Sequence, residues 1–350
     1  MKCFSSAFLT AFALGTLTLA GCNNAATTDN SATDSANNAV TNTTTTGEEK
    51  LSGKPFTVGY NQWIGSVGVF TAKEKGFFKD AGLDVQMKQF SGPADSVPPL
   101  IGGKLDASLT TADTALLLSK EASDNALFNV FITDTSYGAD AVVAQKGIKS
   151  LKDLKGKTVG ATRGQCNELL LQKGLQSVGL SEKDVTITNM DADTAGSAVI
   201  AGKVPAAVTW EPWITKAKNA GANVIYSTRQ AQNLILDVVT TSQKTRDEKP
   251  ADLRAFIAAC AKGNEYALKN PQEAAKVAAK YFGSTVPESR DMMTKVKLYT
   301  TADNKRLMGT TEAPGEAIRS INEVGKFFVA QKVMDKTADA ATLFSADYLP

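Results

Sequence analysis

Three tryptophans stand near the predicted ends of β-strands, where their rings could form the walls of a ligand site. Trp63 follows a strand predicted over residues 56–60, and Trp210 follows one predicted over 206–209, with Trp213 close behind. The face of a tryptophan attracts a cation by about 0.5–2 kcal/mol, depending on desolvation. Each ring could instead fill a core. We predict ligand contact for Trp63 and Trp210, and both roles stay open for Trp213.

Several polar side chains follow other predicted strands, just before a helix begins. Hydroxyl groups and the N–H groups of a helix start could together hold an anion or a carbonyl oxygen. The guanidinium of Arg163 could bind a sulfonate or carboxylate through two parallel hydrogen bonds, and a solvated surface position is an equal alternative. The candidates in this group are Ser91, Thr110, Thr111 and Arg163.

Four carboxylates map to the same region and favour a different ligand chemistry. They are Asp113, Asp140, Glu211 and Asp237. A bare oxyanion such as nitrate would be repelled there, whereas an ammonium group or other N–H donor would be attracted. For Asp140 and Asp237 the alternative is a hinge role, in which they accept hydrogen bonds from backbone amides. We predict a small nitrogen-containing ligand, with a zwitterion such as taurine as one form.

The chain has 350 residues and no histidine. Ser-His-Asp and Cys-His mechanisms and Cys/His zinc sites are therefore excluded, and we expect no enzyme activity, no metal and no cofactor. An exported enzyme that uses Cys166 or a carboxylate pair is the alternative, because a helix start can lower a thiol pKa. We expect Cys166 and Cys260 to be free thiols. The net charge of +2 gives no reason to expect a nucleic-acid partner.

Short apolar strands alternate with helices, such as one predicted over 67–78, and this alternation indicates an α/β fold. About 300 residues exceed what one core usually holds, so we expect two lobes. Each would be a mostly parallel sheet flanked by helices. We assign residues 53–139 and 238–350 to lobe 1 and 140–237 to lobe 2. The hinge would have two segments, near 138–142 and 236–239, with the ligand in the cleft at the strand ends.

The first fifty residues indicate export. Lys2 precedes a short apolar run, and the run ends in Leu19-Ala20-Gly21-Cys22, which resembles the lipobox of bacterial lipoproteins. This resemblance implies a signal peptide over 1–21 and lipidation of Cys22. An ordinary leader with a chance cysteine is the alternative. Residues 22–52 are rich in Ser, Thr and Asn, which predicts a flexible tether to the periplasmic face of a membrane.

Five segments along the chain are similar to one known family: Trp63-Ile64-Gly65, Ala72-Lys73-Glu74-Lys75-Gly76-Phe77-Phe78, Gly138-Ala139-Asp140, Trp210-Glu211-Pro212-Trp213 and Tyr348-Leu349-Pro350. Over nearly all of its globular part, the chain resembles the periplasmic substrate-binding proteins of nitrate/sulfonate/taurine ABC transporters. The resemblance implies the type II periplasmic binding protein fold, a monomer, and an ABC permease as partner. A related group makes a thiamine pyrimidine by consuming its own histidine, and this chain departs from that chemistry. A sensory protein that presents its ligand to a receptor is another alternative.

Overall fold

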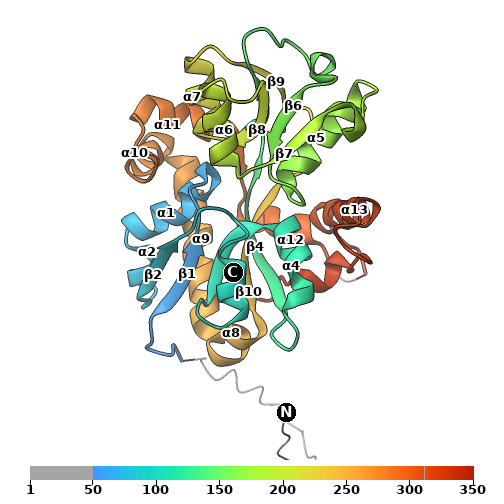
Figure 1. Ribbon diagram of the computed structural model, residues 1–350. Coiled ribbons are helices and arrows are strands. Elements are labelled where there is room, and N and C mark those ends of the chain that lie inside the picture. Colours follow the sequence, from blue (N-terminus) through green and yellow to red (C-terminus); the bar gives the residue numbers. More distant parts are fainter. Residues whose placement is uncertain (1–49, 311) are drawn as a thin grey trace, which may run out of the picture. The chain divides into compact units, whose positions relative to one another are not determined.

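The computed structural model describes residues 50–310 and 312–350 (Figure 1). The predicted signal peptide, Cys22 and the predicted tether as far as residue 49 lie outside the described residues. Leu51 packs against a hydrophobic cluster, and Ser52 donates hydrogen bonds from its amide and its hydroxyl to Asp252. These two residues are therefore part of the packed structure. No described helix is both long and apolar enough to cross a bilayer.

The first sheet has six strands, and most of them point the same way. They are β1 (Phe56–Tyr60), β2 (Val85–Gln89), β3 (Ala107–Thr111), β4 (Leu127–Ser136), β10 (Leu236–Ser242) and β11 (Val296–Leu298). Their order is β11-β4-β10-β3-β1-β2. β1 pairs in parallel with β2 and β3, whereas β10 lies antiparallel between β3 and β4, and β11 lies antiparallel to β4. β3 and β10 are buried along their whole length, as central strands covered on both faces should be.

The second sheet has five strands and the same mixed character. They are β5 (Asp140–Ala144), β6 (Thr158–Ala161), β7 (Thr186–Asn189), β8 (Ala206–Trp210) and β9 (Asn223–Ser227), in the order β7-β6-β8-β5-β9. β6 pairs in parallel with β7 and β8, and β5 is antiparallel to β8 and β9. The prediction of two α/β lobes, each a sheet flanked by helices, is confirmed. In each sheet four strands point the same way, but five of the nine strand pairings are antiparallel. The antiparallel orientation of β5 and β10 relative to their neighbouring strands was not predicted.

The helices cover both sheets (Figure 1). The helix predicted over 67–78 is broken by Gly76, whose φ of 77° ends one helix and begins the next. The helices are α1 (Val67–Glu74), α2 (Phe77–Asp80), α3 (Val97–Ile101), α4 (Ala112–Leu118), α5 (Cys166–Ser177), α6 (Ala192–Ile200), α7 (Trp213–Asn219), α8 (Gln243–Glu248), α9 (Pro250–Lys269), α10 (Pro271–Phe282), α11 (Val286–Met293), α12 (Thr301–Met308) and α13 (Glu316–Ala330).

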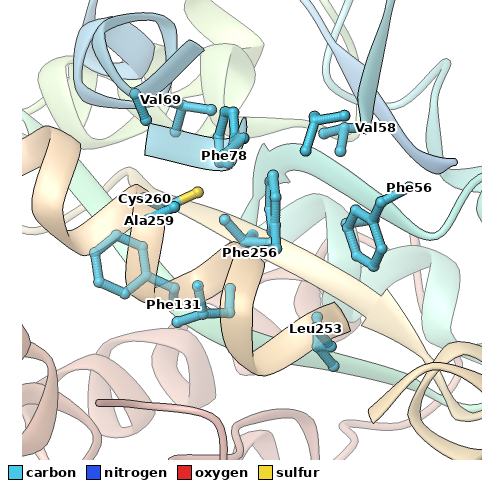
Figure 2. Packing of buried hydrophobic residues seen from close by; sticks show 14 of the residues in the cluster. Phe56, Val58, Val69, Phe78, Phe131, Leu253, Phe256, Ala259 and Cys260 are labelled. Carbon is cyan, nitrogen blue, oxygen red and sulfur yellow. The ribbon is translucent and has the colours of Figure 1, made fainter. Parts of the chain in front are cut away.

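The core of the first lobe forms where α9 packs against the sheet. Phe256 of α9 stacks on Phe56 of β1 at 4.9 Å between ring centroids and on Phe78 of α2 at 5.1 Å. Figure 2 shows these three rings together with Phe131 and Cys260. The position of α1 against α9 depends on glycine, since a Cβ on Gly263 would lie 2.1 Å from a backbone oxygen of α1. This packing fixes α1, and with it the loop that precedes it.

Two segments join the sheets, residues 137–139 between β4 and β5 and residues 228–235 between β9 and β10. They are tied together, because Gly138 donates its backbone N–H to the Thr228 hydroxyl at 2.7 Å. The sheet assignment supports our proposed lobe division, except that Leu236 and Asp237 already belong to β10 of the first sheet. The hinge role of these segments stays a prediction.

Candidate ligand-binding site

A small cavity lies where the ends of strands from both sheets meet. The cavity leaves only about 10 Å³ for the centre of a water-sized sphere. This is close to the room that one water molecule needs. The cavity as it stands is therefore too small for an organic ligand. The lining residues are Asn61, Trp63, Pro93, Thr111, Asp140, Cys166, Trp210, Ile235 and Asp237.

The topology explains why these residues converge. Thr111 and Trp210 are the last residues of β3 and β8, and Asn61 follows directly after β1. Asp140 is the first residue of β5, and Asp237 is the second of β10. β5 and β10 run opposite to their neighbours, so their starts lie beside the carboxyl ends of the other strands. Ligands of open α/β sheets bind at these ends.

Both lining tryptophans are buried and held by carboxylates. The Trp63 indole donates its N–H to Asp134, with Nε1 3.1 Å from Oδ2 and 3.3 Å from Oδ1. The Trp210 indole donates to Asp193 at 2.7 Å. Trp213 is not in the lining, and it packs against the hydrophobic cluster that contains the other two rings. Ligand contact by Trp63 and Trp210 stays a prediction that their positions support.

Four buried aspartates surround the cavity, and only three of them were predicted. Asp113, Asp140 and Asp237 are joined by Asp134, which is fully buried in β4. Both oxygens of Asp113, and Oδ2 of Asp140 and of Asp237, have no hydrogen-bond partner of normal geometry among the described residues. A buried carboxylate without donors loses the solvation that it has in water.

Burial therefore shifts the ionisation of this cluster. Desolvation raises the pKa of Asp134 to about 7, although the hydroxyl of Thr133 and the indole of Trp63 oppose the shift. Desolvation raises the pKa of Asp140 to about 7 as well, and the charges of Asp113 and Glu211 add to it. The pKa values of Asp113 and Asp237 are raised too, in both cases mainly by burial. The cluster thus resists carrying its full negative charge near neutral pH.

Three other predicted residues do not line the cavity. Thr110 donates its hydroxyl to the Pro93 carbonyl at 2.7 Å, while Ser91 is exposed and absent from the lining. The Arg163 guanidinium pairs with Glu168 at 2.8 Å and with Glu182, so it does not face the cavity as an anion ligand would require. The expectation that Arg163 grips a sulfonate is not supported by this geometry.

Glu211 is fully buried just after β8 but is fully partnered. It accepts hydrogen bonds from the backbone N–H and the hydroxyl of Thr215, both at 3.0 Å. Lys295, which precedes β11 of the first sheet, forms an ion pair with it. Glu211 therefore connects the two lobes, and its charge contributes to the raised pKa of Asp140 in the cavity lining.

Sequence reasoning missed Asn61, Pro93 and Ile235 of the lining, as well as Asp134. Cys166 was considered only as a nucleophile. Asp134 carried a usable signal, because it is an acid within the apolar strand that begins at Leu127. Among the described residues, no three His, Cys, Asp or Glu side chains are placed so that they could hold a metal ion.

Comparison with known proteins places these features in context. Residues 63–274 match the family described as NMT1/THI5 like. A Brucella abortus (strain 2308) protein, provisionally named a binding protein, is 26% identical over 84% of this chain and 91% of its own length. The aliphatic sulphonate binding protein SsuA from Escherichia coli superposes with a TM-score of 0.69 at 17% identity, over 83% of this chain and 91% of that chain. The desulfurization enzyme DszB superposes with a TM-score of 0.64 at 14% identity, over 84% and 97%.

Proposed function

The chain belongs to the NMT1/THI5-like family, and on this premise we propose that it captures a small nitrogen- or sulfur-containing organic ligand and delivers it to an ABC importer. A relative over most of its length is named a binding protein, and the fold is that of a periplasmic sulphonate-binding protein. The ligand would be sulfonate-like, as taurine is, or would bear an amine.

The observation that carries this proposal is the origin of the cavity lining. Trp63, Thr111 and Asp237 come from the first sheet, and Asp140, Cys166 and Trp210 come from the second. A ligand there would contact both lobes when they are closed and only one of them when they are open. It would therefore stabilise the closed form through its additional contacts, and a permease could recognise that form.

Matched tryptophan variants test this site. We expect Trp63→Phe and Trp210→Phe to weaken ligand binding by tenfold or more, because both rings line the cavity and lose their indole donors. Trp213→Phe is the control, since Trp213 is outside the lining. Calorimetry on the full chain measures the affinities. Equal binding by all three variants and the wild type would place the ligand elsewhere.

We further propose that acylated Cys22 anchors the protein at the periplasmic face of a membrane. Each buried methylene of an acyl chain contributes about 0.8 kcal/mol to membrane binding. Coil statistics give the predicted tether, residues 22–52, a reach of roughly 30 Å. In a bacterial host, Cys22→Ser should abolish fatty-acid labelling and release the protein into the soluble fraction. Cys3→Ser is the matched control, because Cys3 stands in the leader before the apolar run.

An enzyme on this fold is the second candidate, since DszB shares the architecture and Cys166 lies in the cavity lining. The surroundings of Cys166 favour binding over catalysis. Burial raises the pKa of this thiol well above its usual value, and the charges of Asp113, Asp140 and Asp237 raise it further. A thiol that stays protonated is a poor nucleophile, so we propose that the protein acts by binding alone.

A further inference from the structure

The charges around the cavity are of one sign. Asp140 and Asp237 line it, and the lining contains no lysine or arginine. Asp113 and Asp134 stand close behind, because both act electrostatically on Asp237. Arg163, the cation predicted for this site, pairs with Glu168 and Glu182. An anionic ligand group would therefore meet carboxylates with no compensating positive charge.

The second observation is independent of charge, because it concerns hydrogen bonds. Asp140 and Asp237, which line the cavity, are each at least nine-tenths buried, and Oδ2 of each has no hydrogen-bond partner among the described residues. Buried polar groups of folded proteins are almost always partnered. Two unpartnered acceptors in the lining, from β5 and β10, therefore indicate an occupant that supplies donors in more than one direction.

The geometry restricts what that occupant can be. The described carboxylates and thiols do not converge on a point where a metal ion could be held. A cation with separated donor atoms fits such a spread of acceptors better than a point charge does. The two indole rings in the lining suit the same occupant, because aromatic faces attract organic cations.

We infer that the ligand is a small organic cation with two or more N–H donors and no sulfonate or carboxylate group. A primary ammonium offers three N–H donors, and an amidinium or guanidinium offers four or more in a plane. A quaternary ammonium has none and would leave the Oδ2 atoms of Asp140 and Asp237 unpartnered. The inference rests on the proposed function, and it replaces the zwitterionic form of the ligand by a purely cationic one.

A panel of six compounds tests the inference on the full chain by thermal unfolding and calorimetry at pH 8. The N–H cations are 1,4-diaminobutane, agmatine and benzamidine; the comparison compounds are choline, taurine and isethionate. We expect at least one N–H cation to raise the melting temperature by several degrees and to bind at least tenfold more tightly than the three comparison compounds. The inference is overturned if choline or a sulfonate binds as tightly as the best N–H cation, or if no N–H cation binds at 10 mM.

Isosteric variants locate the effect. Asp140→Asn and Asp237→Asn should each weaken binding of the best cation by tenfold or more. Asp153→Asn is the control and should leave binding unchanged, because Asp153 caps an exposed turn after β5. Unchanged affinity in both cavity variants would overturn the inference. Binding of a sulfonate alone would overturn it and leave the proposed function standing. If neither the panel nor a bacterial metabolite extract stabilises the protein, both fail.

Discussion

A Cβ atom on Gly65 would lie 2.1 Å from the carboxylate of Asp134, closer than any side chain can approach. Gly65 belongs to the short turn Ile64–Ser66 that connects Trp63 to α1. The missing side chain is the reason that Asp134 can lie beneath this turn and accept the Trp63 indole N–H. One residue without a side chain thus positions both a ring and an acid of the site.

Gly65→Ala should therefore damage the site more than the fold. The added methyl group must displace Asp134 or the turn, and overpacking of this kind typically costs about 1–3 kcal/mol. We expect a melting temperature several degrees lower and ligand affinity reduced by tenfold or more. Gly147→Ala is the control, because a Cβ there would meet nothing within 4 Å. Normal ligand affinity in Gly65→Ala would show that Asp134 is not held by this turn.

The buried aspartates predict that the ligand-free protein loses stability as the pH rises. Asp140 has a pKa of about 7 when folded against 3.8 in its reference state, so the native protein holds more protons between these values. The ionisation of Asp140 therefore lowers the free energy of unfolding. This loss is absent below pH 4, grows between pH 4 and pH 7, and is complete above pH 7. For one group it amounts to at most about 4 kcal/mol.

Asp140→Asn provides the measurement, because the amide cannot ionise. Melting temperatures between pH 5 and pH 8 should fall less steeply in this variant than in the wild type. Asp113, Asp134 and Asp237 keep their raised pKa values and so preserve part of the slope, while Glu211 is held by Lys295 and Thr215. Parallel pH profiles of variant and wild type would show that Asp140 ionises normally.

The ion pair between Lys295 and Glu211 should stabilise the contact between the lobes. Burial lowers the pKa of Lys295, but hydrogen bonds to Asp291 and Glu211 raise it overall, so this lysine stays charged. Lys295→Met would leave Glu211 buried without its cation, a change that typically costs about 3–5 kcal/mol. We expect chemical unfolding to show a decrease of this order in the free energy of unfolding.

Lys276→Met is the matched control for this change. Lys276 pairs with Glu273 on an exposed face of α10, and exposed pairs of this kind contribute at most about 1 kcal/mol. A loss in Lys295→Met no larger than the loss in the control would show that the lobes are held together by other contacts.

The two cysteines of the folded part should be unreactive in the native protein. Cys166 and Cys260 are both free and buried, and burial raises both pKa values well above the usual range. In a chain with Cys3→Ser and Cys22→Ser, we expect no reaction with Ellman's reagent until denaturant is added, and then two thiols. Fast reaction of native Cys166 would instead support the enzyme alternative.

The sequence was sufficient to place residues that stand at strand ends. Trp63, Thr111 and Trp210 follow or end strands that alternate clearly with helices, so their convergence followed from the α/β pattern. Asp140 and Asp237 also reach the lining, although they stand at the starts of antiparallel strands. Their position depends on β5 and β10 reversing direction, which local sequence patterns do not specify.

Other residues depended on contacts between distant segments. Arg163 follows β6 as predicted, but Glu182 approaches it from beyond α5 and joins Glu168 in pairing with the guanidinium. Asp134 was missed, and its partner is the indole of Trp63, which comes from the loop after β1. In both cases the partner that decides the role lies in another part of the fold, where periodicity gives no information.

The pairing of each indole with an acid of its own lobe has a consequence for the energetics of recognition. Trp63 is held by Asp134 of β4, and Trp210 is held by Asp193 of α6, so neither ring depends on the opposite lobe for its hydrogen bond. Both walls of the site are therefore preorganised while the lobes are apart. Ordering a flexible side chain on association costs about 0.5–1.5 kcal/mol, and here that ordering is completed during folding. The measured affinity should then report the ligand's own contacts and the closure of the lobes.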